Sequence, residues 1–219
     1  MTNHTERPAT TTSPLAGDDP RMLFARAVSL AHDTIDAVAP EQLHEPTTVG
    51  MDVRDLMEHL VMVLRRVACA GRGQPVPSWP ADAADVADDR FATAWREAAH
   101  DVQAAWTDDG LLEQAIDLPW GTFSGAEVLG TYTNEVTVHT WDLAKATGQE
   151  PRWDEAVLAA ADASIRAQLP MAARAPMWEA AKTQLPPGVP WETPFADAVE
   201  VPDDAAAIDR LVAWNGRRP

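Results

Sequence analysis

The amino-acid sequence predicts a mainly α-helical protein, an antiparallel four-helix bundle followed by a short C-terminal α+β appendage. Four stretches, each roughly 18 to 23 residues long, repeat apolar residues at intervals of three and four, which is typical of amphipathic helices. Capping and helix-stopping residues flank these stretches, and one long loop and one hairpin-like segment connect them. Since each helix must bury one apolar face, side-by-side packing is the expected solution.

The first and third helices follow from their apolar spacing and their flanking residues. The first is expected over residues 20–39, because acidic residues before Pro20 can cap it and Pro40 stops the pattern. The third is expected over residues 86–106, after a loop rich in Pro, Gly and Asp.

The second helix is expected over residues 53–70. Asp52 is its expected N-cap, and Gly71 is its expected end. His59 lies at the edge of its apolar face. That face is formed by Val53, Leu56, Met57, Leu60, Leu64 and Val67.

The fourth helix, expected over residues 124–146, places two ionisable side chains on its apolar face. A capping box begins it at Ser124, and Gly148 should end it in the left-handed conformation. Glu135 and His139 are one turn apart and project into the core sector. That sector is formed by Val128, Tyr132, Val136 and Leu143.

The remaining elements are shorter. A fifth helix is expected over residues 154–168. A short extended piece near residues 198–201 and a last helix over residues 205–214 should follow. Trp141 points away from the core face of its own helix, so the C-terminal segment is expected to cover it.

The chain divides into three parts. Residues 1–17 should be a disordered tail, because they mix Thr, Pro and Ser without periodicity. Residues 18–170 should form the helical bundle, with a short two-stranded excursion within residues 114–123. Residues 171–219 should form the appendage that packs on the bundle.

Composition argues against several classes of function. The chain has 17 Lys and Arg against 34 Asp and Glu, a formal net charge of −17, and such a surface repels nucleic acid and anionic lipid. No apolar run is long enough to span a bilayer, and no signal-peptide pattern is present, so we expect a cytoplasmic protein. A single cysteine excludes an internal disulfide and a Cys-rich metal site. We expect a monomer or a homodimer.

Glu135 and His139 suggest a metal site, because an ionised carboxylate in an apolar core is costly unless it is paired or bound to a metal. A buried Glu–His pair that satisfies itself is the simpler interpretation, and His59 alone is typical of a partly buried, hydrogen-bonded histidine. If the second and fourth helices face each other, His59, Glu135 and His139 converge as three ligands of one divalent ion. A fourth position then remains for water or substrate, as in catalytic sites.

Three stretches resemble a known family. They are DVRDLMEHLV (52–61), NEVTVHTWDLAKATGQ (134–149) and VPDDAAAIDRLVAW (201–214), and they are similar to the actinobacterial metal-binding DinB-like family. The best-known members of that family are mycothiol-dependent maleylpyruvate isomerases. The resemblance covers most of residues 20–215 and implies a DinB-like four-helix bundle with a C-terminal appendage.

The resemblance also implies a metal and a chemistry. By similarity, His59, Glu135 and His139 are the zinc ligands, with Ni²⁺ or Fe²⁺ as other metals that could occupy the site. A zinc ion with an exchangeable position can deprotonate a low-molecular-weight thiol such as mycothiol, which then attacks a small-molecule electrophile. An isomerase releases the thiol after rotation about the former double bond, whereas an S-transferase keeps the adduct.

The sequence departs from the better-known members in two places. Thr48 and Met51 stand where many relatives carry Cys and Trp, and the C-terminal part is shorter than the second domain of the isomerases. Asp142, one turn beyond His139, either orients a ligand or pairs with a nearby Lys or Arg such as Lys145 or Arg54.

Other functions fit the same ligands. A zinc hydrolase and a non-haem Fe(II) oxygenase both use two histidines and a carboxylate. A non-catalytic binding module, in which the ion only fastens two helices, is a third alternative.

Overall fold

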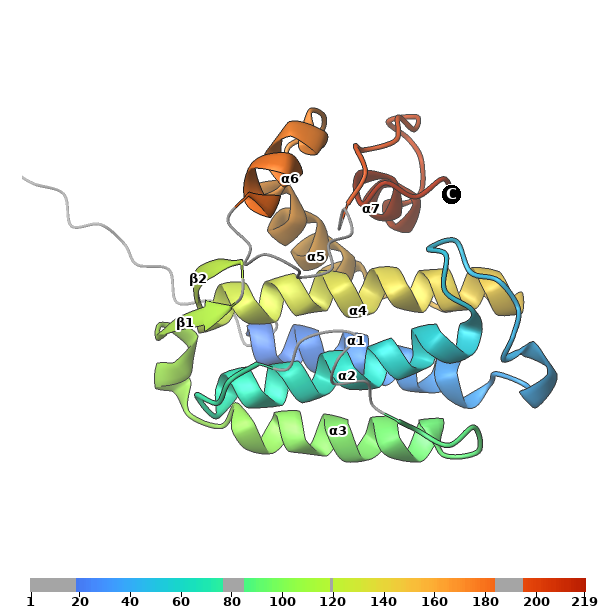
Figure 1. Ribbon diagram of the computed structural model, residues 1–219, viewed down its shortest axis with the longest axis horizontal. Coiled ribbons are helices and arrows are strands. Elements are labelled where there is room, and N and C mark those ends of the chain that lie inside the picture. The colour runs from blue at the N-terminus through green and yellow to red at the C-terminus, as the bar shows by residue number, and fades with distance from the viewer. Residues whose placement is uncertain (1–18, 77–84, 119, 184–194) are drawn as a thin grey trace, which may run out of the picture.

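The computed structural model describes residues 19–76, 85–118, 120–183 and 195–219 and is mainly helical, as predicted (Figure 1). Residues 1–18 and 184–194 lie outside the described residues, so the prediction of a disordered tail over residues 1–17 stays a prediction. The helices are α1 (Pro20–Asp36), α2 (Val53–Gly71), α3 (Phe91–Ala105), α4 (Gly125–Thr147), α5 (Glu155–Gln168), α6 (Arg174–Lys182) and α7 (Ala207–Trp214), the short 3-10 helices are η1 (Pro40–Gln42) and η2 (Asp109–Leu112), and the strands are β1 (Ala115–Leu118) and β2 (Gly121–Ser124).

The helices α1 to α4 pack side by side around a shared apolar core (Figure 1). Within this group, α4 lies mainly against α1 and α2, and α3 lies mainly against the same two helices. The apolar faces predicted from the spacing are buried; Leu56, Leu60 and Leu64 of α2 and Val128 and Val136 of α4 are fully enclosed.

The helices α1 and α4 run in the same direction. At their starts, Arg21 of α1 pairs with Asp109 of η2 at 2.7 Å, and α4 also contacts η2. At their ends, the side-chain amide of Gln149 donates to the Thr34 carbonyl at 3.0 Å. Both pairs of ends therefore meet, which only a parallel pair allows.

The helices α2 and α3 are also parallel to each other. Near their starts, the Arg54 guanidinium lies 5.8 Å from the ring centre of Phe91. Near their ends, the indole N–H of Trp106 donates to the Val67 carbonyl at 2.9 Å. The prediction of an antiparallel bundle is therefore wrong for α1/α4 and α2/α3, and it holds for α1/α3 and α2/α4. The physical reason is the long connection from α2 to α3, which returns the chain to the opposite end of the group.

Local capping chemistry explains the bounds of the best-predicted helices. The Asp52 carboxylate accepts from the Asp55 N–H at 2.8 Å and starts α2. The predicted capping box of α4 is present, because the Ser124 hydroxyl accepts from the Glu127 N–H and the Glu127 carboxylate accepts from the Ser124 N–H. Gly148 ends α4 with φ of 70°, the left-handed conformation that favours glycine.

Other bounds differ from the predictions. Helix α1 stops at Asp36, and α3 begins at Phe91 rather than residue 86, because a turn in which the Arg90 N–H donates to the Ala87 carbonyl precedes it. Gly71 is still helical, so the predicted end of α2 is one residue early. The last helix begins at Ala207, two residues later than predicted.

The C-terminal part of the structure differs most from the prediction. Helix α6 was not predicted. The expected extended piece at residues 198–201 is not a strand, and its Val199 N–H donates to the Ala213 carbonyl instead. Over the described positions of residues 171–219 there is no strand, so the α+β prediction for the appendage is wrong there. Extended sequence patterns of a few residues form strands only when a partner edge lies beside them.

The two-stranded excursion is confirmed. Strands β1 and β2 pair antiparallel, with Ile116 opposite Phe123. The Gly125 N–H donates to the Gln114 carbonyl at 3.0 Å, so the hairpin delivers the chain directly into α4.

A second apolar cluster covers the other face of α4. Val138 and Trp141 of α4 pack with residues of α5 and α7, which lie along α4 on the side away from α2 and α3 (Figure 1). Trp141 is buried, as predicted from its position opposite the core face. The helix α4 therefore has two buried faces and connects the two apolar clusters.

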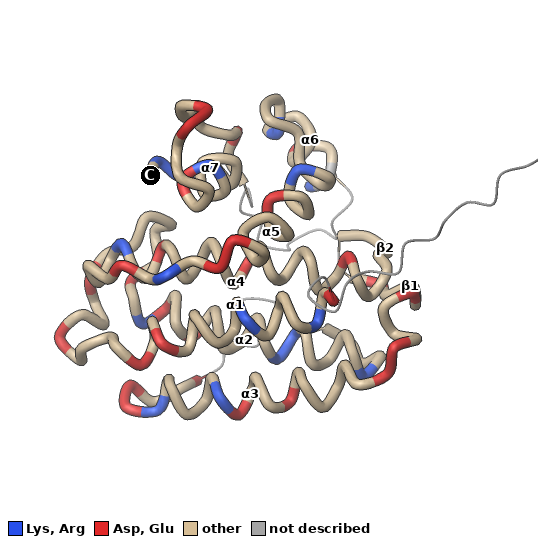
Figure 2. The backbone as a smooth tube through the Cα atoms, turned by 180° about the vertical axis from the view of Figure 1, so that it is seen from behind, with Lys and Arg blue, Asp and Glu red and all other residues tan. Residues whose placement is uncertain are grey.

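Asp and Glu residues are spread along the helices and loops, with fewer Lys and Arg between them (Figure 2). Among the described helices, none is long and apolar enough to cross a membrane.

Candidate metal centre

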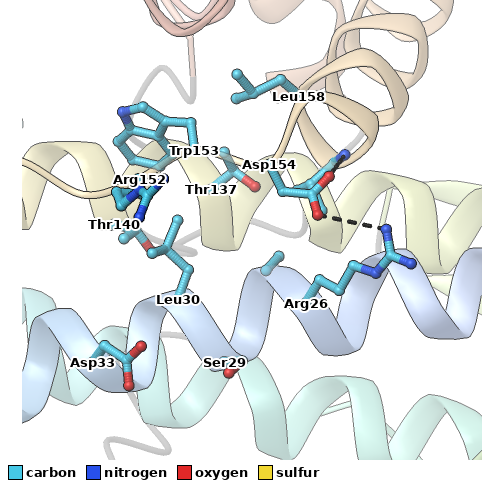
Figure 3. A pocket seen from close by; sticks show the side chains of 12 residues that line it. Arg26, Ser29, Leu30, Asp33, Thr137, Thr140, Arg152, Trp153, Asp154 and Leu158 are labelled. Atoms are coloured by element: carbon cyan, nitrogen blue, oxygen red, sulfur yellow. Dashed lines mark hydrogen bonds and ion pairs between the residues drawn. The ribbon is translucent and has the colours of Figure 1, made fainter.

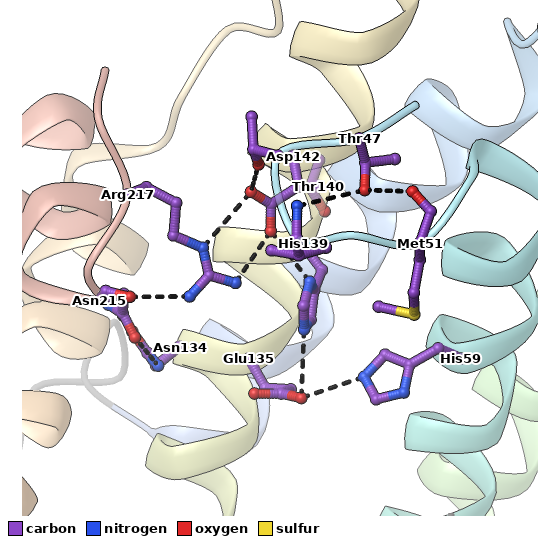
Figure 4. A network of polar contacts seen from close by, with 12 residues as sticks. Thr47, Met51, His59, Asn134, Glu135, His139, Thr140, Asp142, Asn215 and Arg217 are labelled. Carbon is purple, nitrogen blue, oxygen red and sulfur yellow. Dashed lines mark hydrogen bonds and ion pairs between the residues drawn. The ribbon is translucent and has the colours of Figure 1, made fainter. Parts of the chain in front are cut away.

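His59, Glu135 and His139 meet between α2 and α4. His59 comes from the second turn of α2, at the edge of its buried face, and the other two come from the middle of α4. Because α2 and α4 are packed against each other, the edge of one helix faces the core sector of the other (Figure 4). The side-chain proximity expected from the sequence is therefore present.

One carboxylate oxygen lies at the centre of the cluster. Glu135 Oε1 is 3.2 Å from His59 Nε2 and 3.4 Å from His139 Nε2. The two imidazole rings are 4.9 Å apart between centroids and nearly perpendicular, at 77°. The three potential ligand atoms all lie within 4.8 Å of one another.

Burial and neighbouring charges shift the pKa values of the three side chains in different directions. Burial lowers the pKa of His59, and its hydrogen bond to Glu135 does not compensate. Burial alone would raise the pKa of Glu135, but the charge of His139 and hydrogen bonds from both imidazoles hold that pKa well below its ordinary range. Burial opposes the charged form of His139, yet the carboxylates of Glu135 and Asp142 raise its pKa to about 9.

These protonation states make the metal-free cluster an ion pair between Glu135 and His139 with a neutral His59 beside it. The three side chains satisfy one another in this state, so the simpler interpretation of the sequence is compatible with the geometry.

The donor types, two imidazoles and one carboxylate, are among those that zinc takes in proteins. Zinc bonds to His and carboxylate ligands are about 2.0–2.2 Å long, so neighbouring ligand atoms in a tetrahedral site are about 3.3 Å apart. The two Glu135–imidazole separations, 3.2 and 3.4 Å, are close to this value and are also ordinary hydrogen-bond lengths, whereas the three ligand atoms as a set are only within 4.8 Å of one another. The side chains of His59 and His139 are 11% and 9% exposed and that of Glu135 is 25% exposed, so Glu135 is the most exposed member of the cluster.

Asp142 is fully buried and orients His139. Its Oδ2 is 3.0 Å from His139 Nδ1. A carboxylate can only accept, so Nδ1 of His139 carries a proton in both the charged and the neutral ring, and Nε2 faces Glu135. Although burial raises the pKa of Asp142, the contacts with His139 and Arg217 lower it to about 2. Lys145 and Arg54, the alternative partners considered from the sequence, contact Trp141 and Glu58 instead.

Two further side chains hold Asp142. Arg217, from the segment after α7, donates to it from Nη2 at 3.0 Å and from Nε at 3.4 Å. The Thr48 hydroxyl also donates to Asp142. Thr48 thus has a structural role beside the cluster, and Met51 packs against the core. Arg217 carried no sequence signal, because its partner is 75 residues away in the chain.

The C-terminal segment is also tied to α4 by a pair of buried amides. The amides of Asn134 and Asn215 donate to each other at 3.1 and 3.0 Å (Figure 4). Asn134 follows the same helical spacing as Val138 and Trp141, the face that α5 and α7 cover. That spacing is the signal from which a buried partner for Asn134 could have been inferred.

The other histidines considered lie away from the cluster. His32 and His44 contact the acidic side chains of Asp33 and Asp52, and His100 is exposed on α3.

A cavity of about 220 Å³ lies between α1, α4 and the start of α5 (Figure 3). Thr137 and Thr140 line it, but their hydroxyls donate to carbonyls of their own helix. Two charged lining residues, Arg26 and Asp154, pair with each other at 3.5 Å. None of the three candidate ligands lines this cavity, so it is separate from the candidate metal centre.

Comparison with known proteins identifies relatives in Mycobacterium tuberculosis. No family model matches the chain, and no solved structure matches it. Uncharacterized protein Rv0738 of strain ATCC 25618 / H37Rv and Uncharacterized protein MT0763 of strain CDC 1551 / Oshkosh are each 31% identical to the chain over 202 residues. The match covers 91% of this chain and 98% of each relative. At this identity and coverage, the chain belongs to the same protein family as these two mycobacterial proteins.

Proposed function

We propose that the protein is a zinc-dependent enzyme that activates a low-molecular-weight thiol, as an S-transferase or an isomerase. The observation that carries the proposal is the convergence of two imidazoles on one carboxylate oxygen at 3.2 and 3.4 Å, with Glu135 the most exposed member of the cluster. Three protein ligands and an accessible fourth position are typical of catalytic zinc sites. We further propose that α1 to α4 are the DinB-like bundle implied by the resemblance.

The residues of the chain have distinct roles in this proposal. His59, Glu135 and His139 would hold the ion, and Asp142 keeps the proton of His139 on Nδ1 so that Nε2 can be a ligand. A zinc ion bound here would supply a thiolate nucleophile at neutral pH. Arg217 and Thr48 fix Asp142 and thereby the orientation of His139. A cytoplasmic location would keep such a thiol reduced.

The test is elemental analysis of the protein purified without added metal, followed by titration with thiols. We expect about one equivalent of zinc in the parent protein and large losses in the His59→Ala, Glu135→Ala and His139→Ala variants. His32→Ala and His100→Ala are the matched controls and should retain the metal. Equal metal content in all five variants would remove the site from consideration.

Two other functions share the donor set. Two histidines and one carboxylate also suit a non-haem Fe(II) oxygenase, and metal identity separates the two chemistries. Because the cluster links α2 to α4, a metal with only a stabilising role is the non-catalytic alternative. An ion that stabilises the fold but exchanges no ligand with added thiol would favour that alternative.

A further inference from the structure

The Tyr132 hydroxyl is buried without a hydrogen-bond partner among the described residues. The residue is 3% exposed and lies one turn before Glu135 on α4. Buried tyrosine hydroxyls are normally partnered, since leaving one unsatisfied costs about 1–3 kcal/mol. A ligand bound at the candidate active site would therefore be a suitable hydrogen-bond partner for the Tyr132 hydroxyl.

Arg66 of α2 lies on the same side of the candidate metal centre. The helices α2 and α4 are antiparallel, because Thr48, before α2, contacts Asp142, whereas His59 contacts Glu135, about two turns earlier on α4. Moving from His59 to Arg66, two turns along α2, therefore corresponds to moving back along α4 from Glu135 towards Tyr132. Long side chains of a helix lean towards its N-terminus, which carries the Tyr132 ring further in that direction. Burial raises the pKa of Tyr132 most, and the charges of Arg66 and Glu135 also act on its hydroxyl.

We propose that Tyr132 and Arg66 form an anion-binding subsite beside His59, Glu135 and His139, and that this subsite takes the carboxylate of a small thiol or electrophile. Both groups are hydrogen-bond donors in this setting, and a guanidinium matches the geometry of a carboxylate. This inference rests on the proposed function and names its substrate class.

The charges of the site agree with such a ligand. A divalent ion and the Glu135 carboxylate together leave one positive charge, while Asp142 and Arg217 neutralise each other. A thiolate balances that charge, and a carboxylate on the same molecule is a suitable acceptor for the two donors of the subsite. The whole chain has a formal net charge of −17 and would repel such a molecule, so selection for an anion must come from the site itself.

The first test compares two thiols on the cobalt(II)-loaded protein, in which the thiolate–cobalt absorption band reports binding. Mercaptoacetate carries a carboxylate, and 2-mercaptoethanol is a neutral thiol of similar size. We expect the parent protein to bind mercaptoacetate about tenfold more tightly, as one charge-assisted contact allows. Tyr132→Phe should reduce this preference severalfold, and Arg66→Gln should abolish it. The matched control Arg65→Gln removes the same charge from the exposed neighbouring position and should keep the preference.

The second test needs no metal. Tyr132 is the only tyrosine in the sequence, so protein labelled with 3-fluorotyrosine gives a single ¹⁹F resonance. Acetate, compared with chloride at equal ionic strength, should shift this resonance with saturation in the parent and in Arg65→Gln but not in Arg66→Gln. A protein that binds no cobalt but shows the saturable shift contradicts the proposed function and keeps the anion subsite. An absent or non-saturating shift, or an equal thiol preference in all variants, overturns the subsite.

Discussion

Both buried faces of α4 contain polar side chains, but the hydrogen bonding of these side chains differs between the two faces. On the face towards α5 and α7, Asn134 pairs with Asn215 through two reciprocal hydrogen bonds, so each amide satisfies the other. On the face towards α2, two imidazoles share one carboxylate oxygen of Glu135, the carboxylate is partly exposed, and the nearby Tyr132 hydroxyl has no partner among the described residues. A closed neutral pair is typical of a structural contact, whereas an open charged cluster with an unused donor is typical of a site for a ligand.

The largest expected difference between the two faces is how a substitution on each changes the stabilisation of the protein by a bound metal ion. Zinc at a thousandfold excess over its dissociation constant should raise the free energy of unfolding by about 4 kcal/mol, because only the folded state holds the three ligands together. Thermal unfolding with zinc and with a chelator measures this gain. Glu135→Gln should remove it, and Asn134→Ala on the other face should keep it. The same gain in Glu135→Gln would show that the ion binds elsewhere.

The next largest effect is expected at Asp142. The change Asp142→Ala leaves the Arg217 guanidinium nearly buried without its carboxylate and should destabilise the protein by about 3 kcal/mol. It also frees the His139 ring, so zinc affinity should fall about tenfold or more. Denaturant unfolding and competitive zinc titration measure the two effects. Asp162→Ala, which breaks a surface pair with Arg166, should change stability by no more than about 0.5 kcal/mol. Similar losses in both variants would contradict a special role for Asp142.

A smaller effect is expected at the amide pair. The change Asn134→Ala leaves Asn215 buried with part of its hydrogen bonding lost and should cost about 2 kcal/mol of stability, with zinc content unchanged. A double-mutant cycle with Asn215→Ala should reveal a coupling energy, because the two residues share this pair of hydrogen bonds. Additive losses, or a loss of zinc, would mean that the two faces are not independent.

The smallest effect is expected at Tyr132. The change Tyr132→Phe removes a hydroxyl that has no partner among the described residues, so stability should stay within about 1 kcal/mol of the parent or rise. Denaturant unfolding checks this. A loss well above that value would indicate that the hydroxyl already has a structural partner and would weaken the case for a ligand there.

Much of α4 could be predicted from local sequence. Ser124, Glu127 and Gly148 specify its two ends through hydrogen bonds and a left-handed residue that involve only near neighbours. The spacing of Val128, Val136 and Leu143 identifies the core face of α4, because the period of a helix is also a property of near neighbours in the chain. Helix α6 and the start of α3 were missed because their surroundings, and not their propensities, decide where they begin.

The sequence by itself determined which side chains α4 presents on each face, because a helix has a regular period and its capping groups are adjacent in the chain. Only the tertiary structure decided that α2 brings His59 to Glu135, that α2 and α3 run parallel, and that Arg217 reaches Asp142. The reason is that contacts between distant segments depend on how the connections return the chain and on which apolar faces meet. No local pattern of residues encodes that choice.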